Sequence, residues 1–344
     1  MLTIFYVTLL VITTIIWGYI FYKRDYHPQP WKVVKHSFMI GLFAMVPIFA
    51  YKHIYKNFLP TLSEYEIFRP LVESPFMIGI SVFMLNLVIL SLLLFGLSGA
   101  ISLIVNKLNY SVLINLKNAI KNEPLGFTAV SILLGLVVYF QTLTQNTFVM
   151  PVVGGIIGSI LFLAVIEEYI KHLMVRITDD KKIKDIDDAI TLSIVVGLAF
   201  AFIEIIIYCL FTGNIDILFY RSLISMPIHL VASGIFGYFY GLAHFAKPIV
   251  KLEEGGEKTY RSKWLPKFLS LKRSTLYHEE KIIEGTFFAT LFHAAMNLFF
   301  EFNLGFLAIP CIVLGIILIF RMYKMGQSEN RLLNRLKRKG LGRA

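Results

Sequence analysis

The stretch Ile166-Glu167-Glu168-Tyr169-Ile170-Lys171-His172 places three ionisable side chains at the end of a long apolar run. No charged residue occurs from Phe148 to Ile166, so the segment is typical of a membrane helix whose last turns carry Glu167, Glu168 and Lys171. A charge near the centre of such a helix costs about 2.5–3.5 kcal/mol, so we expect the cluster to face protein or water. On a helix, Lys171 can neutralise one of the two carboxylates and leave the other free. A simpler interpretation, that these residues mark the cytoplasmic end of the helix, stays open at this point.

The composition excludes a soluble fold. Of the 344 residues, 57% are hydrophobic and only 16% are charged, which departs from soluble averages in the direction of a polytopic membrane protein. Cys209 and Cys311 both lie inside apolar runs, so neither a disulfide framework nor a CxxC metal site is expected.

Nine apolar segments predict an all-α polytopic membrane protein with about nine transmembrane helices. They are expected at about residues 2–22, 37–51, 76–105, 125–143, 148–174, 189–211, 219–245, 285–300 and 304–320. The first segment lacks a basic n-region and a small-residue cleavage site, so we expect it to be a retained helix. Residues 106–124 are predicted to form an amphipathic interfacial segment, and residues 247–284 a long basic loop.

The distribution of Lys and Arg predicts the orientation. When alternate loops are assigned to one side, 29 of the 33 Lys and Arg fall on that side, and only Lys52, Lys56, Arg69 and Arg221 fall on the other. The N-terminus is therefore expected outside and the C-terminus in the cytoplasm, in a multi-pass protein of the cell membrane. The net charge of +11 indicates this topology and an attraction to membrane lipids, and not a nucleic-acid partner.

Small residues recur at helical spacing in two of the expected spans. Gly154-xxx-Gly158 and Ser233-xxx-Gly237-xxx-Gly241 predict that helix backbones approach closely there. Such packing would draw the polar positions of neighbouring helices together.

Polar residues also occur deep inside the expected spans six to eight. Glu204 lies more than about 20 Å along its helix from Asp188, so it cannot reach the cytoplasmic face and needs a partner or a proton. His229 lies well inside the next span, while His293 and Asn297 share one face of the span after it. Because every such group needs a buried partner, we expect these residues and the two glutamates of span five to meet in one cavity.

That set of side chains suits hydrolysis of a peptide bond within a membrane cavity. A carboxylate can act as general base toward water, a histidine can orient that water, and an Asn can donate to an oxyanion. Two histidines and a glutamate are also the ligand types of a catalytic zinc site, so a metal site stays open, with Glu167, His229 and His293 as its ligands. The sequence lacks HExxH and GxGD, and Ser233 lacks the first glycine of a GxSG motif.

Taken together, Glu167-Glu168-xx-Lys171, Phe200-xxx-Glu204, Pro227-x-His229 and His293-xxx-Asn297 resemble the motifs of the PrsW family of intramembrane proteases. The family is similar, more distantly, to the type II CAAX prenyl endopeptidases. The resemblance covers residues 148 to about 300, less than half of the chain. It divides the chain into N-terminal helices at 1–147, a PrsW-like catalytic core at 148–303, and a last span with a basic cytoplasmic tail at 304–344.

The resemblance implies a membrane-embedded endopeptidase that cleaves a single-pass or membrane-anchored protein, such as an anti-sigma factor. The residues that it implies for catalysis are Glu167, Glu168, Lys171, Glu204, His229, His293 and Asn297. Glu167 would be the general base, with its charge state set by Glu168 and Lys171. We favour a glutamate-activated water that needs no cofactor, with zinc as the alternative. The pair Leu192-Ser193 and Ile205 depart from the family pattern, which bears on substrate specificity.

Two other function classes stay open. One is a non-catalytic membrane scaffold, because related folds include a scaffold subunit of gamma-secretase. The other is a proton-coupled transporter that uses Glu204 and the histidines as a relay, although the internal repeat common in transporters is missing.

Overall fold

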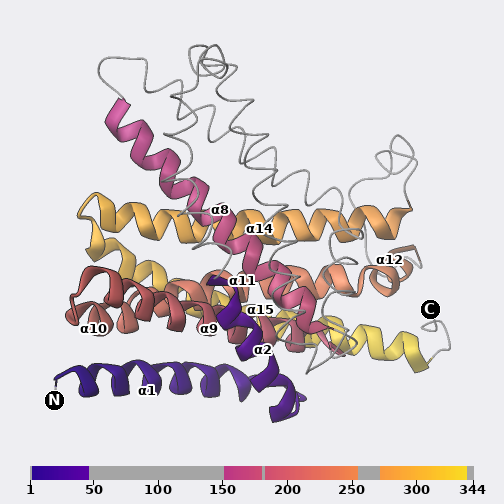
Figure 1. The fold of residues 1–344 in the computed structure, drawn as a ribbon. Helices are drawn as coiled ribbons and strands as arrows, with labels where there is room; N and C mark the ends of the chain where they lie inside the picture. The colour runs from indigo at the N-terminus through magenta and orange to yellow at the C-terminus, as the bar shows by residue number, and fades with distance from the viewer. Residues whose placement is uncertain (1, 46–150, 180–182, 255–271, 339–344) are drawn as a thin grey trace, which may run out of the picture.

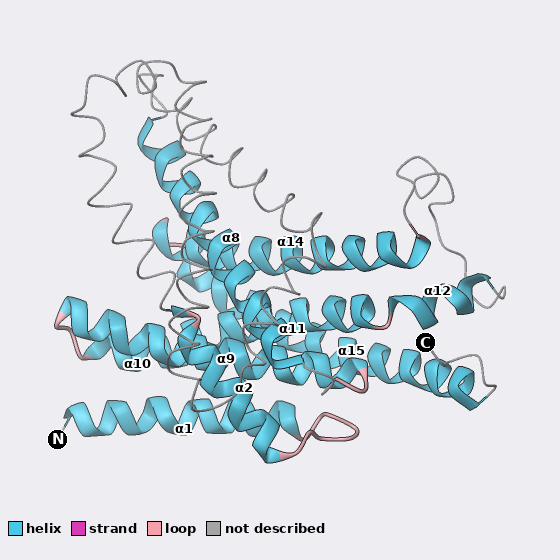
Figure 2. Cartoon of the chain, turned by 45° about the vertical axis from the view of Figure 1, so that its right-hand side comes forward, coloured by secondary structure: helices cyan, strands magenta, loops and turns pink. Residues whose placement is uncertain are grey.

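The structure is a computed structural model that describes residues 2–45, 151–179, 183–254 and 272–338. All secondary structure in these residues is helical, which confirms the all-α class (Figure 2). The helices are α1 (Leu2–Tyr22), α2 (Trp31–Phe43), α8 (Pro151–Asp179), α9 (Ile186–Thr212), α10 (Asp216–Leu223), α11 (Ser225–His244), α12 (Ala246–Glu254), α14 (Arg273–Glu301) and α15 (Gly305–Arg338).

Helix α11 lies at the centre of the bundle and packs against α9 and α14. Figure 1 shows α14 along one side and α1 along the opposite side, with α9, α11 and α15 between them. Helices α2 and α8 cross this bundle obliquely, and both contact α9. The oblique path of α8 brings its middle turns past both α9 and α14, which is where its charged residues lie.

Within the described residues, five helical segments are long and apolar enough to cross a membrane, and they match predicted spans one, six, seven, eight and nine. They are Thr3–Tyr22, Ile186–Thr212, Asp216–His244, Arg273–Glu301 and Gly305–Arg331. Helix α8, which carries the charged motif, is not among the five. Predicted spans three and four, the interfacial segment at 106–124 and the last residues of span two lie outside the described residues, so the number nine and the orientation stay predictions.

The prediction that residues 247–284 form a basic loop is wrong for the described part of this stretch, which is helical. Helix α12 occupies its first residues, and α14 begins at Arg273 rather than at residue 285. Hydropathy marks only the apolar part of a helix, whereas backbone hydrogen bonding continues through charged turns when one side of the helix is buried. The early turns of α14 bury Leu276, Tyr277 and Ile282 in this way. Helix α15 likewise continues into the basic tail.

Predicted span seven is broken into two helices. Helix α10 ends at Leu223, and α11 begins at Ser225. Pro227 explains the break, because it has no N–H to donate to the carbonyl of Leu223 and its ring would clash with that carbonyl. The break places His229 in the second turn of α11, at the level where α11 contacts α9.

Close packing of α9 and α11 confirms the prediction made from Ser233 and Gly237. A Cβ atom added to Gly197 would lie only 2.2 Å from Ser233 Oγ, and one added to Gly237 would lie 2.8 Å from the backbone of Ala189 and Ile190. The two helix backbones can approach this closely only because these positions lack side chains. The surroundings of Gly154 and Gly158 lie outside the described part of the structure.

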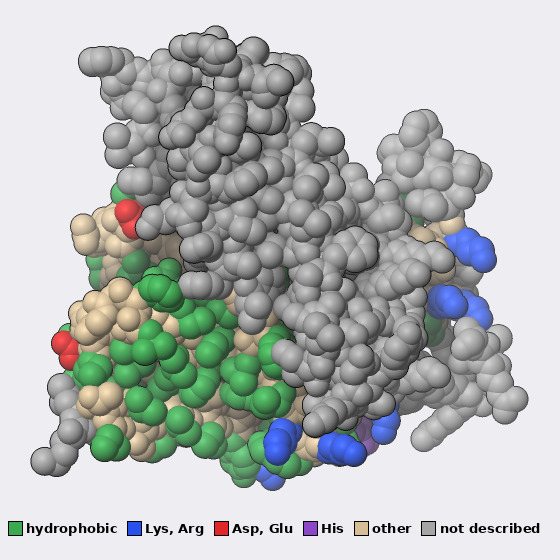
Figure 3. All heavy atoms as spheres, viewed as in Figure 1, with side chains coloured by type: hydrophobic (Ala, Val, Ile, Leu, Met, Phe, Trp, Pro, Cys, Tyr) green, Lys and Arg blue, Asp and Glu red, His purple; other side chains and the backbone are tan. Residues whose placement is uncertain are grey.

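The two ends of the bundle differ in charge. Figure 3 shows Lys and Arg side chains near α12 and near the turn between α1 and α2, and Asp and Glu side chains at the opposite end near α10. Apolar side chains cover much of the visible surface between these ends. This surface is what a bundle that crosses a membrane is expected to present to lipid.

Candidate functional site

Four helices bring the predicted polar residues together in the middle of the bundle. Helix α8 supplies Glu167, Glu168 and Lys171, α9 supplies Glu204, α11 supplies His229, and α14 supplies His293 and Asn297. All except the half-buried Asn297 are at most 5% exposed. Charged groups buried this deeply are stable only when they are paired, so their contacts define the site.

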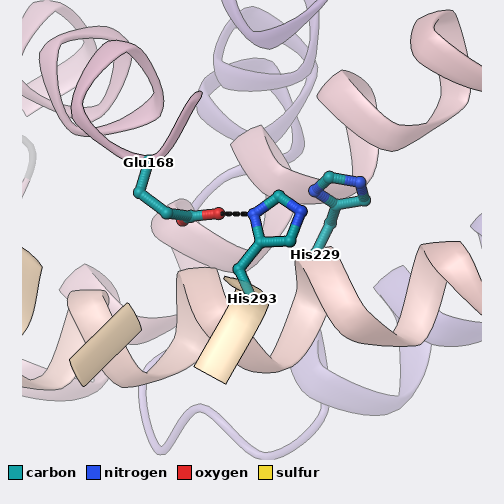
Figure 4. Close-up of side chains that lie close together, drawn as sticks. All are labelled: Glu168, His229 and His293. Atoms are coloured by element: carbon teal, nitrogen blue, oxygen red, sulfur yellow. Dashed lines mark hydrogen bonds and ion pairs between the residues drawn. The ribbon is translucent and has the colours of Figure 1, made fainter. Parts of the chain in front are cut away.

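The first half of the site is built around the carboxylate of Glu168. Its Oε1 atom accepts hydrogen bonds from Lys171 Nζ and from His293 Nδ1, the latter at 2.6 Å (Figure 4). The lysine lies one helical turn further along α8, which is the i,i+3 partner that the sequence allows. Glu168 is therefore a carboxylate that Lys171 neutralises.

The second half of the site is built around Glu204. His229 Nε2 lies 2.9 Å from Glu204 Oε2, and Arg221 Nη1 lies 3.6 Å from Glu204 Oε1. The guanidinium of Arg221 also lies 3.7 Å from the centre of the Tyr208 ring. Glu204 thus has the buried partner that its position in an apolar helix demands.

Lys171 joins the two halves. Its Nζ lies 3.4 Å from His229 Nδ1, and the rings of His229 and His293 meet edge to face with centroids 4.7 Å apart. A lysine ammonium can only donate, so Nδ1 of His229 accepts and its Nε2 donates to Glu204. Because a carboxylate oxygen accepts, Nδ1 of His293 donates to Glu168.

A pocket of about 610 Å³ opens onto this cluster. The predicted residues that line it are Glu167, Glu204, His229, His293 and Asn297. Glu168 and Lys171 are not among the lining residues, so they lie behind the pocket wall. Glu167 and Glu204 reach one cavity although they lie at different heights along their helices, because α8 crosses the bundle obliquely.

Glu167 is thus the one carboxylate of the α8 pair that faces the pocket. Its Oε2 lies 3.7 Å from His293 Nε2. A water molecule between these two groups could be bound by both of them.

The donor atoms of Glu168, His229 and His293 all lie within 4.8 Å of one another. Two imidazoles and one carboxylate fit a divalent metal such as zinc in both ligand type and proximity. The carboxylate of this set is Glu168, whereas the set expected from the sequence contains Glu167.

The pocket also contains residues that were not singled out as site residues from the sequence. They are Ile160, Leu163, Tyr208, Tyr220, Arg221, Ile224, Ser225, Ile228, Phe300 and Glu301. Helical spacing could have indicated two of them, because Tyr208 follows Glu204 by four residues and Glu301 follows Asn297 by four. Glu301 forms no ion pair with the described residues, and it adds a negative charge to the pocket.

Comparison with known proteins points to one family. Residues 123–254 match the family described as PrsW family intramembrane metalloprotease. Protease PrsW of Geobacillus kaustophilus (strain HTA426) is 31% identical over 140 residues, which cover 38% of this chain and 60% of that protein. No solved structure matches. The matched family segment includes Glu167, Glu168, Lys171, Glu204 and His229. It ends before α14, so it does not cover His293 and Asn297.

Proposed function

We propose, from the membership of this chain in the PrsW family, that it is a membrane-embedded endopeptidase that hydrolyses a peptide bond of a membrane-anchored protein. One observation carries the proposal: of the two adjacent glutamates on α8, Glu167 lines the pocket next to Nε2 of His293, whereas Glu168 binds Lys171 and His293 behind the pocket wall. A carboxylate that lines a pocket can accept a proton from a water molecule bound there.

In the mechanism that we propose, Glu167 takes a proton from a water molecule whose oxygen attacks the carbonyl carbon of the scissile bond. The resulting oxyanion accepts a hydrogen bond from the side-chain amide of Asn297. As the C–N bond breaks, Glu167 returns the proton to the leaving amine. The fixed pairs Glu168–His293 and Glu204–His229 hold both imidazoles in one tautomer and orientation.

A divalent metal would be held by Glu168, His229 and His293. When bound, it would supply Lewis-acid polarisation and would lower the pKa of water. Metal analysis of the purified protein, together with activity after chelation and after zinc is restored, decides between the two forms of the hydrolase.

The test of the proposal is cleavage of a single-pass membrane protein by the purified enzyme. Glu167→Gln is expected to abolish cleavage while the protein remains folded and monodisperse. The matched control is Glu280→Gln on α14, a more exposed glutamate near Lys281, which should leave cleavage unchanged. Equal cleavage by the wild type and Glu167→Gln would rule out Glu167 as the base.

A proton-coupled transporter is the second candidate. The observation that favours it is an unbroken chain of polar contacts from Glu204 through His229, Lys171 and Glu168 to His293, which could relay a proton. Solute flux into proteoliposomes that depends on a pH gradient, with no proteolysis by the same sample, would support this function instead.

We further propose that the chain spans the cell membrane about nine times, with the N-terminus outside and the C-terminus in the cytoplasm. Basic residues gather at the end of the bundle where α12 lies, and the polar pocket is lined by Tyr220 and Glu301 near the other end. Reporter fusions after residues 62 and 258 should therefore report opposite sides of the membrane. An anti-sigma factor is a suitable first substrate for the cleavage test.

A further inference from the structure

A second groove lies between α1, α2 and α9, away from the polar pocket. It is lined on the α9 side by Val195, Leu198 and Phe202, and Val195 lies about half a turn around the helix from Glu204. The groove has a volume of about 390 Å³, and its lining is almost entirely apolar. No step of the proposed hydrolysis uses it.

The charged and amphipathic side chains of this groove lie at one end. Lys35 is the only charged residue among the described residues that line it, and it lies near Trp31 and Tyr22, where the chain turns from α1 into α2. The hydroxyl of Thr14, further along the groove, donates to the carbonyl of Leu10. At the other end, the rings of Phe38 and Phe202 lie 6.2 Å apart. Tryptophan and tyrosine at one end of an apolar surface, together with lysine, mark the level of the lipid headgroups.

The length of the groove matches one leaflet of a bilayer. Its α1 wall runs from Val11 to Tyr22, which is about 16 Å at ~1.5 Å per residue. The hydrocarbon core of a bilayer is about 30 Å thick, so one leaflet is about 15 Å. The groove thus extends from the headgroup level to about the middle of the membrane.

We propose that this groove binds one acyl chain of an anionic phospholipid, whose headgroup is held by Lys35. A hydrocarbon chain fits an almost wholly apolar groove of this length. Basic residues near the membrane surface attract anionic headgroups, and the exposed Lys32 adds to the charge of Lys35.

Gly18 offers a way to fill the groove without disturbing the fold. It lies in the groove wall, and a Cβ atom added there would meet only Leu198 Cδ1, at 3.8 Å. Gly18→Phe should therefore place its ring in the groove. The matched control is Ile16→Phe, because Ile16 is 50% exposed on α1 and does not line the groove.

The experiment measures lipid retained by the full-length protein in native mass spectrometry, with phosphatidylglycerol and phosphatidylcholine of identical acyl chains as probes. The wild type and Ile16→Phe should retain one tightly bound phosphatidylglycerol that Gly18→Phe lacks. In Lys35→Ala, the preference for phosphatidylglycerol over phosphatidylcholine should fall about fivefold, which is the contribution of one lysine near an anionic surface. Lys251→Ala, an exposed lysine on α12, should keep that preference.

Three outcomes would overturn the proposal. The first is equal lipid retention by the wild type and Gly18→Phe, and the second is an unchanged headgroup preference in Lys35→Ala. The third is crosslinking of a photoreactive residue at position 15 to protein instead of lipid, because a polypeptide would then occupy the groove. Circular dichroism and gel filtration of each variant establish that it is folded, and no readout depends on proteolysis.

Discussion

Lys171 is the residue on which the charge balance of the site depends. Its ammonium is 3% exposed, donates to Glu168, contacts His229, and lies 5.2 Å from the centre of the Phe200 ring. A buried ion pair of this kind adds little net stability as a pair. Removal of one partner, however, leaves the other charge buried without compensation.

Lys171→Met is therefore expected to lower the free energy of unfolding by about 3–5 kcal/mol. The double variant Glu168→Gln/Lys171→Met should recover most of this loss, because both charges are gone. The measurement is a double-mutant cycle from unfolding in detergent mixtures. Additive effects of the two substitutions would contradict the pairing, since residues in contact are expected to couple.

Asn297 is predicted to act on the transition state and not on substrate binding. Asn297→Ala should lower kcat by about 10²–10³ and leave KM nearly unchanged, because an oxyanion donor acts only once the charge develops. Steady-state cleavage assays measure both constants. Thr286→Ala on the same helix is the control, since Thr286 donates only to the carbonyl of Ile282 one turn earlier. A rise in KM with unchanged kcat would assign Asn297 to substrate binding instead.

The sequence could predict which residue types meet, but not how they pair. Glu167 and Glu168 are both within reach of Lys171 on a helix, and the choice depends on how α8 is rotated about its axis. That rotation is set by packing against α9 and α14, which no local pattern records. For the same reason, the expected metal ligands contain Glu167, whereas the donor atoms that lie together include those of Glu168.

At the scale of elements, the close approach of α9 and α11 is what brings Glu204 and His229 together. Gly237→Ala is expected to lower the free energy of unfolding by about 1–3 kcal/mol, because its Cβ would lie 2.8 Å from backbone atoms of α9 that cannot move alone. Gly18→Ala is the control, since its Cβ meets nothing closer than 3.8 Å. Thermal unfolding of both variants tests this. Because Ala has a higher helix propensity than Gly, Gly18→Ala should not be destabilised, and equal changes in the two variants would contradict a role for the close approach at Gly237.

Helix positions were predicted better than helix ends. The apolar spans at 189–211 and 304–320 correspond to α9 and α15, but α15 and α14 extend well into charged sequence. Hydropathy detects the part of a helix that contacts lipid, and it misses turns that are stabilised by packing beyond the membrane. The break before α11 could have been expected from Pro227, whose effect on the residue four positions earlier is local.

At the scale of the whole molecule, a second polar cluster joins three parts of the chain at the end opposite α10. Asp25, in the turn after α1, accepts a hydrogen bond from Thr191 of α9, whose hydroxyl also contacts Tyr323 of α15. Asp25 is only 5% exposed, although a charged residue in a turn between two helices is expected to be exposed to water. Nothing in the local sequence signals this burial, because the turn carries basic residues on both sides.

Burial, followed by the nearby carboxylates of Asp188 and Asp187, raises the pKa of Asp25 to about 7. The folded protein therefore binds a proton at Asp25 that the unfolded chain releases near pH 4. Because the folded state holds more protons in this range, stability is expected to fall as the pH rises from about 4 to 7, by a few kcal/mol, and to level off above the folded pKa.

Asp25→Asn carries an amide in place of the protonated carboxyl and can still hydrogen-bond to Thr191. It should flatten the dependence of the unfolding midpoint on pH and should make the protein more stable than the wild type at pH 8. Asp216→Asn on α10, at the other end of the bundle, is the control and should keep the wild-type profile. Parallel pH profiles for the wild type and Asp25→Asn would mean that Asp25 is ionised throughout, and that its burial is offset by a cation near the turn.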